Sequence, residues 1–210
     1  VEALAERWPV AILSGRDRSD VEARVGVSDV FYAGSHGLDI AGRGLRRRPP
    51  EAERAIPEVE RAHAWLRERV GDIPGVRLER KRFSLAVHHR GVADPEAVLA
   101  IERAVAAVHA RLRLRLRTGK RVLELVPDVD WDKGRALRWM LDVMGMDPRC
   151  TFPIHVGDDE TDEDAFAALA GTGAGIRVGR PDAASLADWS VRGPDEVAEL
   201  LAWLEGLPPA

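Results

Sequence analysis

Short apolar runs that end at polar, glycine-containing turns mark the first forty residues. The run Pro9 to Leu13 follows a helical stretch at Val1 to Trp8 and ends at Ser14-Gly15-Arg16, as a buried parallel strand does before a loop. The pattern then predicts a helix over Arg18 to Val25 and a strand over Val30 to Ala33. This alternation is typical of α/β folds.

A different pattern occupies the middle of the chain. The arginine-rich segment Gly42 to Pro50 is predicted to be a loop, and apolar residues at helical spacing predict helices over Ile56 to Val70 and Pro95 to Arg111. Leucines alternate with arginines from Leu112 to Arg117, as in an antiparallel strand with one solvated face. Further strands are expected at Val76–Glu79, Phe83–His89 and Arg121–Val126. These elements predict an α+β unit.

The α/β alternation returns after Lys133. Helices and strands are expected in turn at Gly134–Met144, Thr151–Val156, Asp162–Ala170, Gly175–Val178 and Asp195–Glu205. The order of the three segments predicts one discontinuous core domain, residues 1–42 and 127–210, with a second domain of residues 43–126 inserted in it.

Composition excludes several classes of protein. The 210 residues are 45% hydrophobic, and 31 basic residues face 35 acidic ones, so no net positive field attracts nucleic acid. The arginine series in Leu112 to Arg117 lacks the interleaved aromatic residues of a nucleic-acid surface. A single cysteine, Cys150, excludes an internal disulfide framework and a cysteine-based zinc site.

The sequence also bears on location. No apolar run approaches about 18 residues, so no membrane span is expected. No signal-peptide pattern opens the chain, and we expect a cytoplasmic protein. The chain begins at Val1 inside a predicted helix that runs straight into a strand, and we therefore expect a further N-terminal segment to precede it.

The strongest chemical signal is a group of acids that follows the strand ending at Val156. Six of the seven positions from 158 to 164 are Asp or Glu. Ligands of open α/β sheets bind at the carboxyl ends of strands, and carboxylates there suit Mg²⁺. The alternative is an acidic first helical turn, which capping and the helix dipole would favour. It applies most to Glu160, Glu163 and Asp164.

Two further positions suit phosphate chemistry. Ser14 ends a predicted strand, and its hydroxyl and the following backbone N–H groups could hold a phosphate. Lys133 opens a predicted helix, where its ammonium could neutralise charge that develops during phosphoryl transfer. Taken singly, each has an ordinary alternative: a turn at Ser14-Gly15-Arg16 and an exposed lysine beside a capping Asp132.

In chain order these features resemble the second, third and fourth motifs of haloacid-dehalogenase-like phosphotransferases. The match is closer to one family of that superfamily, the trehalose-6-phosphate phosphatases, and it covers almost the whole chain. The segments that carry it are Leu13–Arg16, Tyr32–Gly37, Asp130–Gly134 and, most specifically, Gly157–Phe166.

The resemblance implies a Rossmann-like core with an α+β cap inserted between the second and third motifs. It implies Mg²⁺-dependent hydrolysis of a small-molecule substrate, trehalose 6-phosphate, to trehalose and phosphate through an aspartyl-phosphate. The implied catalytic residues are Ser14, Lys133, Asp158 and Asp162; those implied for Mg²⁺ are Asp158, Asp159 and Asp162. The implied substrate-binding residues are Gly15, Arg16, His36, Gly37, Glu79, Lys81 and Glu124.

Two departures from the family pattern stand out. Val126 occupies a position where the family often has an arginine. The family's first motif, a strand followed by Asp-x-Asp-Gly-Thr that supplies the nucleophile, does not occur in these 210 residues, and Asp128-Val129-Asp130 belongs to the third motif. We expect the first motif upstream of Val1, so that the chain alone lacks a central strand and is inactive.

Two other functions compete with this interpretation. One is a related sugar phosphatase acting on sucrose phosphate, a glycerate-linked sugar or a hexose phosphate, against which Glu79, Lys81 and Glu124 argue. The other is a catalytically silent domain that binds sugar phosphate and regulates or stabilises a trehalose-phosphate synthase, as a partner or as a fusion.

Overall fold

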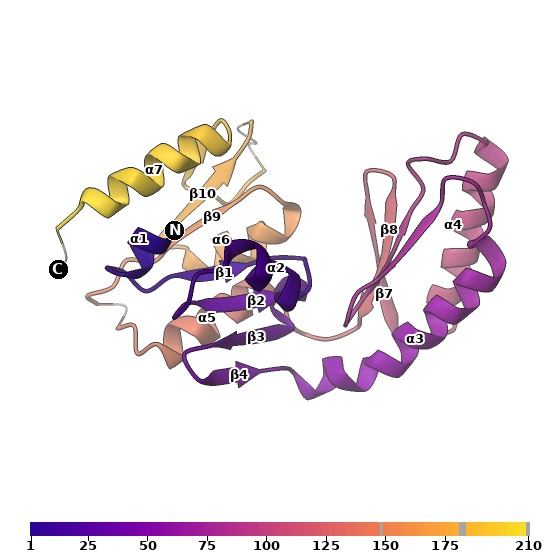
Figure 1. Cartoon of the computed structure of the whole chain (residues 1–210), viewed down its shortest axis with the longest axis horizontal. Helices are drawn as coiled ribbons and strands as arrows, with labels where there is room; N and C mark the ends of the chain where they lie inside the picture. The colour runs from indigo at the N-terminus through magenta and orange to yellow at the C-terminus, as the bar shows by residue number, and fades with distance from the viewer. Residues whose placement is uncertain (148, 181–183, 209–210) are drawn as a thin grey trace. The chain divides into compact units, whose positions relative to one another are not determined.

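The computed structural model describes residues 1–147, 149–180 and 184–208 (Figure 1). It divides into two compact units. One unit comprises Val1–Arg47 and Trp131–Ala210, and the other comprises Arg48–Asp130. The chain therefore leaves the first unit once and returns to it once. None of the helices among the described residues is long and apolar enough to cross a membrane.

The discontinuous unit contains two small sheets. In the first, β1 (Ala11–Leu13) pairs in parallel with β2 (Phe31–Gly34), and β3 (Asp39–Gly42) and β4 (Leu45–Arg47) extend it as antiparallel strands. In the second, β9 (Ile154–Gly157), β10 (Ala174–Val178) and β11 (Trp189–Val191) are all parallel. In the described residues, β1 and β9 each pair on one side only.

Helices cover both faces of the first sheet because its residues alternate in direction. Phe31 and Ala33 pack with α5 (Lys133–Val143), whereas Val30 and Tyr32 pack with Val21 of α2 (Arg18–Val25). A third cluster joins β1 to α5 and α6 (Glu163–Leu169). The remaining helices are α1 (Glu2–Ala5), α7 (Pro194–Gly206) and the 3₁₀ turns η1 (Ser35–Gly37) and η2 (Glu160–Asp162).

The continuous unit is an antiparallel sheet with two helices. Its strands run in the order β5 (Arg77–Arg80), β6 (Leu85–His88), β8 (Val122–Pro127) and β7 (Leu114–Gly119). The apolar residues of α3 (Pro50–Val70) and α4 (Pro95–His109) form one core with the apolar face of the sheet. The opposite face carries polar side chains. The predicted α/β class with an inserted α+β unit is therefore confirmed.

The prediction of a loop over Gly42 to Pro50 is wrong in part. It contains β4, which pairs with β3, and α3 begins at Pro50 rather than at Ile56. Four arginines and two prolines concealed both elements, because an exposed edge strand needs no apolar alternation and proline is tolerated in a first helical turn. The pairing of β4 with β3 places residues 43–47 in the discontinuous unit, and residues 127–130 fall in the other.

Candidate active site

A buried ion pair lies at the start of α5. The Lys133 ammonium is 2.8 Å from Oδ1 of Asp162, and each side chain is 5% exposed. A lysine in the first turn of a helix faces the positive end of the helix dipole, and a buried charge is costly unless it is paired. The carboxylate of Asp162 offsets both the unfavourable helix dipole and the cost of burying the ammonium. The sequence alternative of an exposed lysine at position 133 is excluded.

Asp162 accepts hydrogen bonds from three directions. Besides Lys133, His155 Nε2 lies 2.8 Å from Oδ1, and the backbone N–H of Asp159 donates to Oδ2 over 3.0 Å. Burial alone would raise the pKa of Asp162, but the hydrogen bond with His155 and the charge of Lys133 hold this pKa well below its usual value. An ionised carboxylate only accepts, so His155 donates from Nε2.

The acidic turn is folded tightly around Asp162. Asp159 caps η2 by accepting from the N–H of Glu160 over 2.7 Å, and its own N–H bonds Asp162 in a capping box. A Cβ on Gly157 would overlap the carboxyl carbon of Asp162, so only glycine fits at the end of β9. Asp159 is thus the N-cap of η2, a role that the sequence analysis did not give it, while the neighbouring Asp158 is exposed.

The donor set determines how a cation could bind here. In the part of the chain that the structure describes, no three His, Cys, Asp or Glu residues converge closely enough to hold a metal ion by themselves. Asp158 offers an exposed carboxylate, whereas the oxygens of Asp162 already accept three hydrogen bonds. Mg²⁺ commonly uses one or two carboxylates together with water and phosphate oxygens, and the exposed carboxylate of Asp158 is a ligand of that kind.

The loop after β1 is held by the loop after β2. The backbone N–H of Ser14 donates to Ala33 over 2.9 Å, and the N–H of His36 donates to the Ser14 carbonyl over 2.9 Å. The Ser14 hydroxyl accepts from the Arg16 N–H over 3.2 Å. The imidazole of His36 lies against Gly15, where a Cβ would come within 2.6 Å of the ring. Ser14, Gly15, Arg16 and His36 therefore form one local structure.

The Ser35-His36-Gly37 turn has an unusual backbone. All three residues have positive φ values, 50°, 57° and 91°. Two successive non-glycine residues in this region are strained, and contacts on both sides hold them in place. The Ser35 hydroxyl donates to Asp17 over 2.9 Å, and the Trp131 indole donates to the Gly37 carbonyl over 2.7 Å. Through Trp131 the turn is joined to the segment that leads into Lys133.

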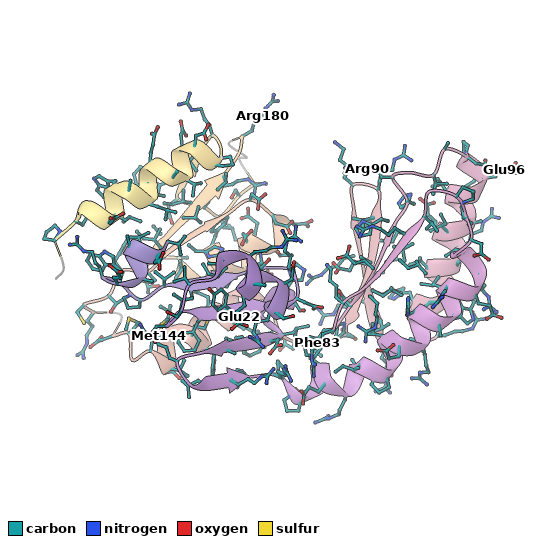
Figure 2. All side chains as sticks on the ribbon, viewed as in Figure 1. Glu22, Phe83, Arg90, Glu96, Met144 and Arg180 are labelled. Carbon is teal, nitrogen blue, oxygen red and sulfur yellow. The ribbon has the colours of Figure 1, made fainter. Side chains whose placement is uncertain are left out.

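The other three predicted substrate residues, Glu79, Lys81 and Glu124, lie together on the polar face of the sheet in the unit Arg48–Asp130. Figure 2 draws the side chains of this unit and labels Phe83, Arg90 and Glu96 in it. The Lys81 ammonium is 3.0 Å from Oε1 of Glu124, and the buried Ser84 hydroxyl donates to the same oxygen over 2.8 Å. Glu79 is 3.0 Å from His88 Nε2 and from the Arg77 guanidinium. Carboxylates and an ammonium in this arrangement match the hydroxyl groups of a sugar.

Sequence reasoning did not assign roles to His155 and Ser84. His155 lies two positions before Gly157, and Ser84 lies two positions before Ala86. Residues two apart in a strand share a face, so this spacing could have indicated that His155 and Ser84 face the site. Their partners, Asp162 and Glu124, come from other elements, and only the folded chain shows those contacts.

Comparisons with known proteins agree on one family. The family model described as trehalose-phosphatase matches residues 1–194. The trehalose-phosphate phosphatase of Mycobacterium marinum is 46% identical over 205 residues, which are 95% of this chain and 52% of that protein. The chain thus spans about half the length of the curated relatives it matches.

Solved structures give the same result. The crystal structure of a trehalose-6-phosphate phosphatase related protein aligns with a TM-score of 0.78 at 26% identity, covering 97% of this chain and 83% of that one. The C-terminal domain of a Candida albicans trehalose synthase regulatory protein aligns with a TM-score of 0.71 at 15% identity, covering 97% of this chain and 84% of that one. The second likeness shows the fold alone.

Proposed function

Because the chain belongs to the trehalose-phosphatase family, we propose that its protein hydrolyses trehalose 6-phosphate to trehalose and phosphate. The observation that carries this proposal is the buried Lys133–Asp162 pair beside the Gly157-Asp158-Asp159 turn. A buried ammonium paired with a carboxylate can neutralise the negative charge of a transferring phosphoryl group. A silent binding domain would have no transferring phosphoryl group for this ammonium to neutralise.

Ser14 and its loop would bind the phosphoryl group. The hydroxyl of Ser14 and the backbone N–H groups of Gly15 and Arg16 are the donors that this turn offers to phosphate oxygens. The Ser14 hydroxyl now accepts from the Arg16 N–H, so ligand binding would replace a local hydrogen bond. His36, stacked on Gly15, would limit how far the loop can move.

Asp158 would hold Mg²⁺, with Asp159 and Asp162 keeping the turn in shape. When bound, the ion would supply positive charge to the phosphoryl oxygens. Asp162 would act chiefly by positioning Lys133 and the N–H of Asp159, since its oxygens already accept three hydrogen bonds.

The family resemblance requires an aspartate nucleophile and a second aspartate that acts as acid and base. We place both upstream of Val1. In support, β1 and β9 are parallel-sheet strands that each keep one unpaired edge in the described residues. A strand paired to both would end beside Ser14 and Asp158. The carboxylate of the first upstream aspartate would attack phosphorus, while the second upstream aspartate protonates the departing sugar oxygen.

The unit Arg48–Asp130 would select the sugar. Glu79 and Glu124 would accept from sugar hydroxyls, and Lys81 would donate to one. We also propose that the enzyme works in the cytoplasm.

A substrate panel tests this function. Phosphate release should be measured with the chain extended through the codons that precede Val1 in its gene, in Mg²⁺, on trehalose 6-phosphate, sucrose 6-phosphate and glucose 6-phosphate. We expect trehalose 6-phosphate to give the highest kcat/KM by at least about tenfold, because hydrogen-bonding sites discriminate strongly between hydroxyl patterns. A preference for either other sugar would overturn the substrate, and release from none would overturn the enzyme.

A further inference from the structure

The polar face of the antiparallel sheet carries a fourth charged side chain in register with the proposed sugar contacts. Glu79 of β5 pairs with Ala86 of β6, Ala86 pairs with Glu124 of β8, and Glu124 pairs with Arg117 of β7. Residues directly opposite one another in antiparallel strands project from the same face. Arg117 therefore ends a row that contains both proposed carboxylates.

The core confirms the direction in which Arg117 projects. Leu116, its neighbour on β7, packs against the buried cluster formed with α3 and α4, together with Leu123 and Leu125 of β8. Successive residues of a strand point to opposite faces. Arg117 consequently lies on the face away from the helices.

The Arg117 guanidinium has a donor without a partner. Its Nη1 atom is buried and makes no hydrogen bond among the described residues. Buried guanidinium N–H groups are normally satisfied, because an unpaired one loses its hydration without compensation. The neighbouring Arg115 differs, since its guanidinium bonds the carboxylate of Asp128 and the carbonyl of Val129. Of these two arginines, Arg117 has a donor to offer a ligand.

The surroundings indicate the chemistry of that ligand. Ala86 and Val126 lie on the same face and are 2% and 6% exposed, and they form an aliphatic floor. Around it stand two carboxylates, Glu79 and Glu124, and two cations, Lys81 and Arg117. A further cation, Arg77, lies 3.0 Å from Glu79. Carboxylates and cations interspersed around an apolar floor suit a neutral polyol, whose ring is apolar on its face and hydroxylated at its rim, because both its hydroxyl donors and its hydroxyl acceptors find partners.

We propose that Arg117 is a further substrate-binding residue, donating from Nη1 to a hydroxyl oxygen of the sugar that Glu79, Lys81 and Glu124 bind. The inference rests on the proposed function and extends it by one specificity-determining contact. Arg117 contacts the sugar part and not the phosphoryl group, so it contributes equally to binding of the substrate and of the free disaccharide.

Isothermal titration of the protein extended through the codons that precede Val1, in EDTA so that no substrate turns over, tests the proposal with trehalose, trehalose 6-phosphate and inorganic phosphate as ligands. Arg117→Gln should weaken the affinities for trehalose and for trehalose 6-phosphate by a similar factor, about tenfold, and leave phosphate binding unchanged. Arg117→Lys should recover part of the loss. The matched control is Arg113→Gln, which removes the same charge from an exposed arginine of the same alternating series and should change no affinity.

The outcomes distinguish a failure of the proposed function from a failure of the Arg117 contact alone. If wild-type protein binds neither sugar, the proposed function fails and this inference with it. If wild type binds both sugars and R117Q binds them equally well, this inference alone is overturned. Loss of affinity for trehalose 6-phosphate only would assign Arg117 to the phosphoryl group and overturn the sugar contact.

Thermal melting supplies a readout of folding. Since Nη1 has no hydrogen-bond partner in the described part of the chain, R117Q should melt within about two degrees of wild type. If R117Q melts at a lower temperature, the titration is repeated with Arg117→Met, which keeps the aliphatic stem and removes only the guanidinium. Equal sugar affinity of R117M and wild type would then overturn the proposal.

Discussion

Lys133 and Asp162 lie 2.8 Å apart although 29 residues separate them in the chain, and both side chains are buried. Lys133 opens α5 and Asp162 closes the turn before α6, so one ion pair ties the third and fourth motifs together. Three donors act on this single carboxylate, and the geometry of the whole acidic turn follows from it.

The two members of the pair should respond differently to substitution. Lys133→Met leaves Asp162 with its bonds to His155 and to the N–H of Asp159, so we expect a loss of about 3 kcal/mol in the free energy of unfolding. Asp162→Asn leaves a buried ammonium at the positive end of a helix dipole, and the loss should approach about 5 kcal/mol. Urea denaturation measures both. A larger loss for K133M than for D162N would contradict the account.

Stability should depend on pH through Asp162. Its pKa is held below the unfolded value of about 3.9, so its ionised form stabilises the fold above that pH, and this contribution disappears as the pH falls through the folded-state pKa. The difference in unfolding free energy between wild type and D162N should therefore be constant near neutrality and shrink below about pH 5. A difference that grows on acidification would show that Asp162 is not the stabilising anion.

Gly157→Ala should damage the acidic turn. The added Cβ would overlap the carboxyl carbon of Asp162, and relief requires moving a buried ion pair, at an expected cost of about 1–3 kcal/mol. Gly193→Ala is the matched control, because a Cβ there meets no atom within 4 Å. Thermal melting of the two variants checks the prediction. Equal melting temperatures would mean that Gly157 is not sterically required.

Trp131→Phe should affect the His36 turn. The substitution removes the 2.7 Å hydrogen bond to the Gly37 carbonyl but keeps an aromatic ring under the Arg47 guanidinium, which lies 4.5 Å from the ring centroid. We expect a loss of about 1 kcal/mol in stability and a higher KM at similar kcat. Trp203→Phe, at an exposed tryptophan, should change neither quantity. An unchanged KM in W131F would separate the turn from substrate binding.

The sequence predicted the elements that carry the motifs better than those that connect them. β1, β9 and α5 follow apolar runs or a helical period, and the family resemblance assigned roles to the residues at their ends. The family model confirms the family, while those roles stay predictions. β3, β4 and β11 were missed, because short edge strands need neither an apolar run nor strict alternation.

The residues inside the site were predictable by type but not by partner. Asp162 was expected near the metal, yet its bonds to Lys133 and His155 assign it a supporting position that the spacing of acids does not reveal. Likewise, Arg117 belonged to an alternating series of arginines that looked uniformly solvated. Strand register decides which member lies beside Glu124, and register is a property of the folded sheet.

The most direct measurement is phosphate release from trehalose 6-phosphate by the chain extended through its preceding codons, with Lys133→Met and with Lys120→Met, an exposed lysine of the same charge. The account predicts Mg²⁺-dependent release by the extended protein and by K120M, a fall in kcat of about 10²–10³ in K133M, and none from the 210 residues alone. Release that K133M retains in full, or no release by the extended protein, would contradict it.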